Sequence, residues 1–128
     1  MIAPRAAPSG RGSRRLLVVD DNVDAATTQA AVLRLLGHEV AVAFDGESAL
    51  EKARVFQPEI VLLDLGMPGM DGFEVARQLR ASQGGEAVKL VAQTGWGQEE
   101  DRRRTREAGF DAHLAKPVDV AALEQLLW

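Results

Sequence analysis

Five polar residues each follow a short apolar run of the sequence, and their side chains could together carry out phosphoryl chemistry. Asp20 and Asp21 form a pair, whereas Asp64, Thr94 and Lys116 follow separate runs. Three carboxylates held at one place repel one another, and a hard divalent cation such as Mg²⁺ relieves that repulsion. An aspartate can act as a nucleophile, while an ammonium and a hydroxyl can bind phosphoryl oxygens. These are the components of phosphoryl transfer, provided that the fold brings them together.

The segments that must position these residues alternate between strand and helix. Short apolar runs predict the strands, and apolar residues at helical spacing predict the helices between them. The predicted strands are residues 16–19, 39–44, 60–63, 89–93 and 112–115. The predicted helices are residues 23–36, residues 99–108 and three helices capped by Asp45, Asp71 and Asp119. Strict alternation predicts an α/β fold with one parallel sheet and helices on both faces. The polar residues would then meet at the carboxyl ends of the strands, where such sheets bind ligands.

Four short motifs stand at these predicted strand ends. They are VVDDN at 18–22, LLDLGMPGMDG at 62–72, the pair Thr94-Gly95 and the pair Lys116-Pro117. In this order the motifs resemble those of response-regulator receiver domains of two-component signalling, and the resemblance spans about residues 16–127. It implies the flavodoxin-like (βα)5 fold, with five parallel strands in the order 2-1-3-4-5 and helices on both faces.

The resemblance also implies a role for each acidic residue. Asp64 would be the phosphoryl acceptor, Asp21 a direct Mg²⁺ ligand and Asp20 a support of the metal. The backbone carbonyl of Gly66, two residues after the acceptor, would be a further ligand. A cis bond between Lys116 and Pro117 is part of the same pattern.

The remaining roles concern the phosphoryl group and the conformational switch. Thr94 would be the switch hydroxyl, and Lys116 would contact a phosphoryl oxygen. Backbone amides of Gly66 and Gly95 would complete the oxyanion cradle. His113 stands where the family often has tyrosine or phenylalanine as a rotameric switch, and an imidazole there would add pH sensitivity.

A receiver domain is a signalling phosphoacceptor that catalyses only its own phosphorylation and dephosphorylation. The implied donor is a histidine kinase or a histidine phosphotransfer protein. The implied target is a protein that contacts the fourth helix, fifth strand and fifth helix. Because the sequence ends at Trp128, directly after the last predicted helix, we expect output by protein contact or onward phosphotransfer. Residues 109–119 are similar to receivers attached to hybrid histidine kinases, so a stand-alone receiver and such a module both remain open.

Composition and charge exclude several other classes of protein. The 128 residues include no cysteine, which excludes disulfides, thiolate metal sites and cysteine nucleophiles. No apolar run approaches the about 18 residues of a membrane span, and the first 15 residues lack the apolar segment of a secretory signal. We therefore expect a cytoplasmic protein without a membrane span.

The formal net charge is −4, but it is unevenly distributed. Four arginines without an acid give the first 15 residues +4, which leaves −8 for the rest. An acidic folded part argues against a nucleic-acid partner. Residues 1–14, rich in small and polar residues, are predicted to be a disordered tail or linker, and residues 15–128 form the predicted receiver domain.

Two alternative functions were weighed against this interpretation. An aspartate-nucleophile phosphatase of the haloacid-dehalogenase type would have a second acid two residues after the nucleophile, where this sequence has Gly66. A pseudo-receiver that binds a partner without accepting phosphate would not need the complete set of acids together with Thr94 and Lys116.

Several residues also have a purely structural interpretation. Asp20 and Asp21 could cap the first helix, because acids favour helix amino termini. Trp96 could shield an acyl phosphate from water or could pack its own loop. His38 follows the glycine that ends the first helix, and it is expected to be an exposed turn residue.

Overall fold

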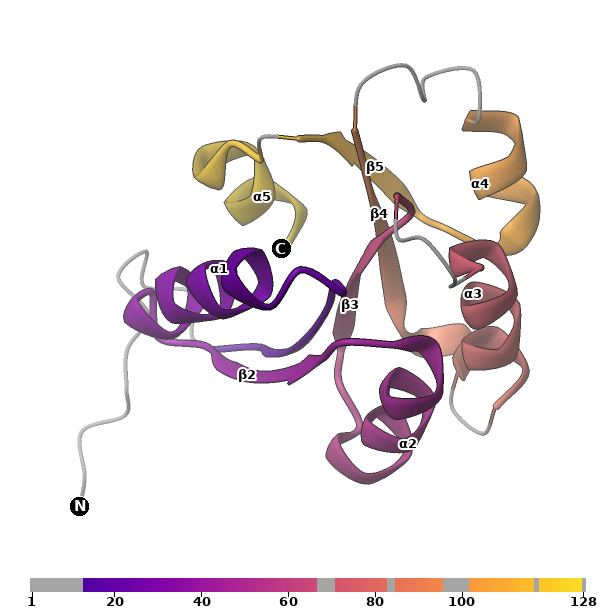
Figure 1. Cartoon of the computed structure of the whole chain (residues 1–128), viewed down its shortest axis with the longest axis horizontal. Helices are drawn as coiled ribbons and strands as arrows, with labels where there is room; N and C mark the ends of the chain where they lie inside the picture. Colours follow the sequence, from indigo (N-terminus) through magenta and orange to yellow (C-terminus); the bar gives the residue numbers. More distant parts are fainter. Residues whose placement is uncertain (1–12, 67–70, 83–84, 96–101, 117, 128) are drawn as a thin grey trace.

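The computed structural model describes residues 13–66, 71–82, 85–95, 102–116 and 118–127. Strands and helices alternate through these ranges (Figure 1). The strands are β1 (Arg15–Val19), β2 (Glu39–Ala43), β3 (Ile60–Asp64), β4 (Lys89–Thr94) and β5 (Ala112–Ala115). The helices are α1 (Val23–Leu35), α2 (Gly46–Phe56), α3 (Gly72–Ala81), α4 (Arg102–Ala108) and α5 (Val120–Leu126), and a 3₁₀ turn η1 (Gly85–Ala87) precedes β4.

All five strands pair in parallel, in the order β2-β1-β3-β4-β5. This order confirms the predicted flavodoxin-like α/β fold. The side chains of β1, β3 and β4 are almost all buried, as expected for inner strands that are covered by helices on both faces. Because the strands are parallel, their carboxyl ends lie along one side of the sheet, which we call the carboxyl edge.

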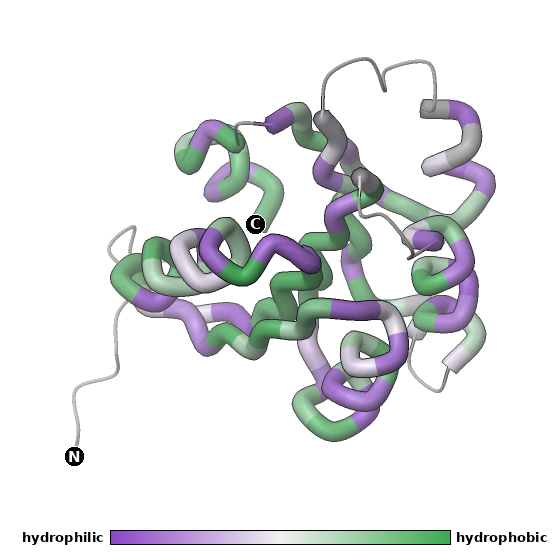
Figure 2. The backbone as a smooth tube through the Cα atoms, in the orientation of Figure 1, coloured by the Kyte–Doolittle hydropathy of each residue, from purple (hydrophilic) through white to green (hydrophobic). Residues whose placement is uncertain are grey.

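The helices divide between the two faces of the sheet. Helices α1 and α5 cover one face, and α2, α3 and α4 cover the other (Figure 1). Alternate residues of β1 enter the two cores: Leu16 and Val18 pack toward α1 and α5, whereas Leu17 and Val19 pack toward α2 and α3. Figure 2 shows hydrophobic residues concentrated along the strands. None of the described helices has the length and apolar character needed to cross a membrane.

Aspartates cap three of the helices, as the sequence predicts. The carboxylates accept backbone N–H groups of the first helical turn: Asp45 from Ser48 at 2.7 Å, Asp71 from Phe73 and Glu74 at 3.0 and 3.3 Å, and Asp119 from Ala121 at 3.1 Å. These caps set where α2, α3 and α5 begin, and therefore where the preceding loops of the carboxyl edge end.

Some element ends differ from the prediction by one residue. Strands β3 and β4 extend to Asp64 and Thr94, while β2 and α1 each end one residue early. Hydrogen bonds of the ladder continue past the apolar run, because backbone pairing does not depend on side-chain polarity. The start predicted for the fourth helix, residue 99, lies outside the described residues.

The expectation that His38 is exposed is wrong. The residue is only 5% exposed. Its Nδ1 accepts the backbone N–H of Arg14 at 3.0 Å, and its Nε2 lies 3.5 Å from a carboxylate oxygen of Glu124. The imidazole therefore joins the start of β2 to α5, a long-range contact that a local turn pattern does not reveal.

Arg80 ties the amino-terminal side of the sheet together. Its guanidinium donates to the carbonyls of Gly109, Gly85 and Val88 and to the carboxylate of Asp111. These groups belong to the segments around η1, before β4 and before β5. One side chain of α3 thus fixes the two segments that lead into β4 and β5, and the other ends of these strands lie at the carboxyl edge.

Candidate functional site

Three carboxylates meet at the carboxyl edge. Asp20 directly follows β1, Asp21 comes next, and Asp64 is the last residue of the adjacent strand β3. One carboxylate oxygen of each lies within 4.8 Å of the others. Asp20 and Asp64 are 5% and 6% exposed, whereas Asp21 is exposed. Two members of the cluster are thus buried, and the third is open to solvent.

None of these acids is the N-cap of α1. Asn22 holds that position, and its side chain accepts the N–H of Ala25 at 3.0 Å. Asp20 instead accepts the backbone N–H of Asn22 at 3.0 Å, which fixes one of its oxygens. Asn22, rather than Asp20 or Asp21, is therefore the N-cap of α1, and the carboxylates of both aspartates lie beside Asp64.

Lys116 reaches this cluster from the end of β5. Its Nζ lies 2.6 Å from Oδ2 of Asp64 and 3.1 Å from Oδ2 of Asp20. Burial by itself would lower the pKa of Lys116, but the hydrogen bonds and charges of Asp64 and Asp20 outweigh it and raise the pKa above its usual value. The ammonium therefore stays protonated and partly neutralises the acids.

The pKa of Asp20 is also raised. Burial is the main cause, and the hydrogen bond from the backbone of Asn22 opposes it. The nearby negative charge of Asp64 adds to the increase, while Lys116 counteracts it. Burial and the neighbouring charge of Asp64 thus both disfavour the ionised form of Asp20.

Three oxygen ligands at these distances fit a hard divalent cation. Mg²⁺ is bound in proteins by one or two carboxylates together with water and phosphate oxygens. The buried pair Asp20 and Asp64, with the exposed Asp21, offers this kind of donor set. Burial and the charge of Asp64 raise the pKa of Asp20, and a cation bound beside it would favour the ionised form.

The backbone beside Asp64 contributes a donor to the site. The N–H of Gly66 donates to Oδ1 of Asp64 at 2.8 Å. Gly95, directly after β4, borders open space, because a Cβ added there would meet no atom within 4 Å. Both glycines lie at the carboxyl edge, where the sequence predicts an oxyanion cradle.

Thr94 is buried at the end of β4, and its hydroxyl contacts the imidazole of His113. The distance from Oγ1 of Thr94 to Nε2 of His113 is 3.0 Å. The ring comes from β5, which pairs with β4 so that Thr94 lies opposite Ala115. The two predicted switch residues are thus in direct contact, and the hydroxyl is engaged by the imidazole.

The sequence did not predict a contact between the side-chain amides of Gln93 on β4 and Gln29 on α1. Gln93 is 3% exposed and precedes Thr94; its side chain exchanges hydrogen bonds with that of Gln29 on α1, at 3.2 and 3.5 Å. A glutamine within the otherwise apolar run of β4 was the signal that could have revealed it, because buried amides need partners. Trp96 and Pro117, and with Pro117 the predicted cis bond, lie outside the described residues.

The chain matches the family model of the response regulator receiver domain over residues 16–127. It therefore belongs to this family, the receiver domains of two-component response regulators, which are signalling domains.

Among relatives, the chain is 42% identical over 104 residues to the DNA-binding response regulator MtrA of Mycolicibacterium paratuberculosis, covering 81% of this chain and 45% of MtrA. It is 37% identical over 102 residues to a gliding motility regulatory protein of Myxococcus xanthus, covering 80% of this chain and 13% of that protein. The chain thus spans less than half the length of these relatives.

A solved structure supports the same family. The receiver domain of the sensor histidine kinase PA1611 from Pseudomonas aeruginosa, with a magnesium ion coordinated in its active-site cleft, is 33% identical and superimposes with a TM-score of 0.80, covering 91% of this chain and 95% of that one.

Proposed function

We propose that this chain accepts a phosphoryl group on Asp64 from the phosphohistidine of a histidine kinase or a histidine phosphotransfer protein. The observation that carries the proposal is the 2.6 Å contact between Lys116 and Asp64, within a cluster that also holds Asp20 and Asp21. A buried acid beside an ammonium and two further acids has the components that phosphoryl transfer needs. We further propose residues 15–128 as the receiver domain and residues 1–14 as a tail.

In the transfer step, a carboxylate oxygen of Asp64 forms a bond to phosphorus while the bond from phosphorus to the donor's histidine nitrogen breaks. The electron pair of the broken bond remains on that nitrogen. The product is an acyl phosphate on Asp64, which water later hydrolyses to the free carboxylate and phosphate.

The surrounding groups would stabilise the added charge. Lys116 can bind a phosphoryl oxygen while it keeps its contact with Asp20. The N–H of Gly66, which now donates to Asp64, would donate to the phosphoryl group together with the N–H of Gly95. Donors that are already in place need little reorganisation when charge develops.

Mg²⁺, when bound, would neutralise both the acid cluster and the phosphoryl oxygens. Asp20, Asp21 and Asp64 would hold it, with the backbone carbonyl of Gly66 as a fourth protein ligand. The close approach of the three carboxylates and the raised pKa of Asp20 support this assignment.

Signalling would begin with Thr94. Its hydroxyl would leave His113 and donate to the phosphoryl group, which would free the imidazole on β5 to move. The partner surface would comprise α4, β5 and α5, where Arg103, Arg106 and Val120 are exposed. The negative charge of the chain beyond residue 15 favours a protein over nucleic acid as the direct partner.

Incubation with acetyl phosphate and Mg²⁺, followed by mass spectrometry of the intact protein, tests the proposal. Wild type should gain the mass of one phosphoryl group, and Asp64→Asn should gain none. Asp45→Asn is a matched control, since Asp45 follows β2 at the same edge and asparagine can also cap a helix. A wild-type protein without added mass would support the pseudo-receiver, and labelled Asp64→Asn would place the acceptor elsewhere.

The phosphatase alternative is distinguished by turnover. Gly66 offers no side-chain acid to protonate a leaving group, so acetyl phosphate should be consumed only as fast as the acyl phosphate on Asp64 hydrolyses. Release of phosphate from varied phosphomonoesters would contradict this.

A further inference from the structure

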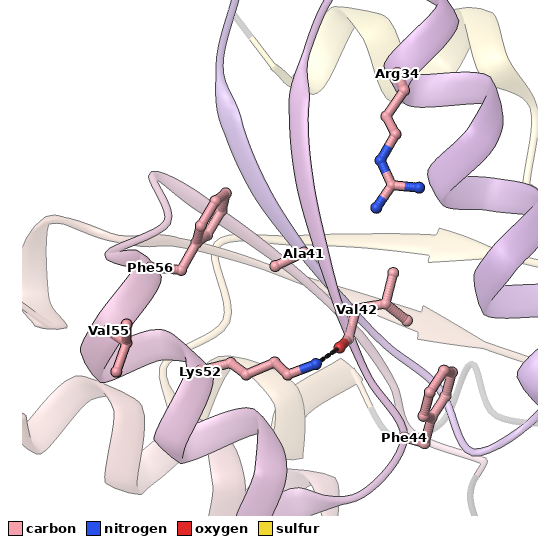
Figure 3. A pocket seen from close by; sticks show the side chains of 7 residues that line it. All are labelled: Arg34, Ala41, Val42, Phe44, Lys52, Val55 and Phe56. Atoms are coloured by element: carbon pink, nitrogen blue, oxygen red, sulfur yellow. Dashed lines mark hydrogen bonds between the residues drawn. The ribbon is translucent and has the colours of Figure 1, made fainter.

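The outer side of β2 forms a groove between α1 and α2. Strand β2 lies at the end of the sheet, and among the described residues it pairs only with β1, on its inner side. The groove has a volume of about 410 Å³, and its lining includes Arg34, Val42, Phe44, Lys52, Val55 and Phe56 (Figure 3). We call this surface the β2 groove.

The backbone of β2 presents two residues to this groove. The N–H of Glu39 donates to Arg14, and the carbonyl of Ala43 accepts from Asp20, so residues 39 and 43 face the β1 side. Because alternate residues of a strand direct their backbone groups to opposite sides, Val40 and Val42 face outward. Their carbonyls are the acceptors that a sixth strand would use.

Two cationic side chains occupy these acceptors. Nη2 of Arg34 donates to the carbonyl of Val40 at 2.8 Å, and Nζ of Lys52 donates to that of Val42 at 2.5 Å. Within the described residues, neither cation forms an ion pair with a carboxylate. Two positive charges are therefore held by neutral carbonyls, in a chain that is acidic beyond its first 15 residues.

We propose that the β2 groove binds an extended acidic segment of a partner protein, which adds to the sheet as a sixth strand beside β2. Carboxylates of the segment would replace the carbonyls as partners of Arg34 and Lys52, because a hydrogen bond between two charged groups is stronger than one to a neutral carbonyl. The released carbonyls of Val40 and Val42 would accept backbone N–H groups of the segment. The two cations would thus exchange carbonyl partners for carboxylates, and the two carbonyls would exchange cations for backbone N–H groups.

The geometry specifies the pattern of the segment. Arg34 belongs to α1 and Lys52 to α2, which cover opposite faces of the sheet (Figures 1 and 3). Neighbouring side chains of a strand point to opposite faces, so two acids at adjacent positions would reach the two cations. Apolar residues on the α2 side would cover Val55, which is 70% exposed, and apolar residues near the end of β2 would cover Phe44, which is 39% exposed.

The same contacts exclude other occupants. A neutral strand would displace the two cations without offering them partners, so the groove selects against neutral edges and protects β2 from nonspecific pairing. Residues 1–14 of the chain itself contain three arginines and no acid. Charge repulsion therefore disfavours this segment, and an acidic segment of another protein fits the groove better.

The test uses a blocked eight-residue peptide of valine and threonine with two glutamates at its centre, and a matched peptide with glutamines instead. Titration of the glutamate peptide into the ¹⁵N-labelled protein should give saturable chemical-shift changes centred on the amides of Val40 and Val42. The glutamine peptide should bind more weakly.

Arg34→Gln and Lys52→Gln should each weaken binding of the glutamate peptide about three- to fivefold, as for exposed ion pairs. Arg77→Gln is the control, since Arg77 is an exposed arginine of α3 that pairs with Glu74. A glutamate peptide that is N-methylated at its central amides should bind about tenfold more weakly, because it lacks the backbone donors.

Several results would overturn the proposal. Equal affinity for both peptides would show that the carboxylates do not contribute to binding. Equal losses of affinity in Arg34→Gln and Arg77→Gln would show that the peptide binds outside the β2 groove. Undiminished binding of the N-methylated peptide would exclude strand addition. Dimerisation in sedimentation velocity that is lost in Arg34→Gln and Lys52→Gln would assign the groove to a second copy of the chain. All variants alter exposed side chains, and circular dichroism would establish that they fold.

Discussion

At the scale of single residues, His113 is the contact partner of Thr94, the residue proposed as the switch. Nε2 of the imidazole lies 3.0 Å from the Thr94 hydroxyl, so in the proposed mechanism the hydroxyl must leave the ring before it can bind the phosphoryl group. The phenylalanine that the family often has at this position would not hold the hydroxyl, since its ring has no nitrogen to form this hydrogen bond.

His113→Phe should therefore favour the phosphorylated conformation. Loss of one hydrogen bond of about 1 kcal/mol should tighten binding of the phosphoryl analogue beryllofluoride about fivefold in the presence of Mg²⁺. The same substitution in a Thr94→Val background should have no such effect, because no hydroxyl is left to release. An equal gain in both backgrounds would show that His113 acts independently of Thr94.

Lys116 allows a test at high pH. Against the lowering effect of burial, Asp64 and Asp20 raise the pKa of Lys116 above its ordinary 10.5, so the folded protein holds this proton more tightly than the unfolded chain does. This stabilisation is fully present below pH 10.5 and is lost as the pH rises through the folded pKa. Lys116→Met should therefore lower the free energy of unfolding at neutral pH without Mg²⁺, and the difference from wild type should shrink above pH 10.5. Urea denaturation across this range measures it; a difference independent of pH would contradict it.

A substitution at Asp21 should weaken Mg²⁺ binding without affecting folding, because Asp21 is the exposed member of the acid cluster. Mg²⁺ at a hundredfold its dissociation constant should raise the free energy of unfolding of wild type by about 2.7 kcal/mol. Asp21→Ala should lose most of this gain while its stability without Mg²⁺ stays nearly unchanged. Asp24→Asn, an exposed acid in the first turn of α1, should retain the gain. If Asp21→Ala responded to Mg²⁺ like wild type, Asp21 would not be a ligand.

At the scale of elements, the N-caps determine where the loops of the carboxyl edge end. The carboxylate of Asp71 accepts two N–H groups of α3, from Phe73 and Glu74. Asp71→Ala should lower the free energy of unfolding by about 1 kcal/mol, and Asp71→Ser should restore most of it, because serine is also a good N-cap. Chemical denaturation measures both. No loss in the alanine variant would mean that water replaces the cap without penalty.

The element pattern was predictable because it depends on local signals. Apolar runs, helical spacing and capping aspartates are each encoded within a few residues, and the strand order followed from the family resemblance. The position of the acids and Lys116 at the carboxyl edge was predictable for the same reason, since each lies at or just after the end of a strand.

Contacts between distant elements were not predictable in this way. The burial of His38 depends on Arg14 and Glu124, and the Gln29–Gln93 pair joins α1 to β4 across 64 positions. Neither contact has a periodic signal, because each depends on how helices pack on the finished sheet. The β2 groove likewise became visible only with the orientation of Arg34 and Lys52.

At the scale of the whole molecule, Arg80 connects segments that end at the site. Arg80→Gln should lower the free energy of unfolding by about 2–4 kcal/mol, because it leaves several carbonyls and the carboxylate of Asp111 without their charged donor. Arg77→Gln, on the exposed side of the same helix, should change stability by less than about 0.5 kcal/mol. Urea denaturation of the two variants provides the comparison, and similar losses would show that the network around Arg80 is not special.

The contacts of Lys116 span 52 positions to Asp64 and 96 positions to Asp20. Parallel strands cannot pair without crossover connections, so such a sheet forms slowly and through contacts distant in sequence. A nascent chain that ends between residues 64 and 116 contains all three acids but lacks their ammonium. Its carboxylates would repel one another without the ammonium that lies between Asp20 and Asp64 in the folded protein. In the proposed mechanism, competence to receive a phosphoryl group would therefore arise only when the last strand joins the sheet, and a partly synthesised copy would not compete for the donor.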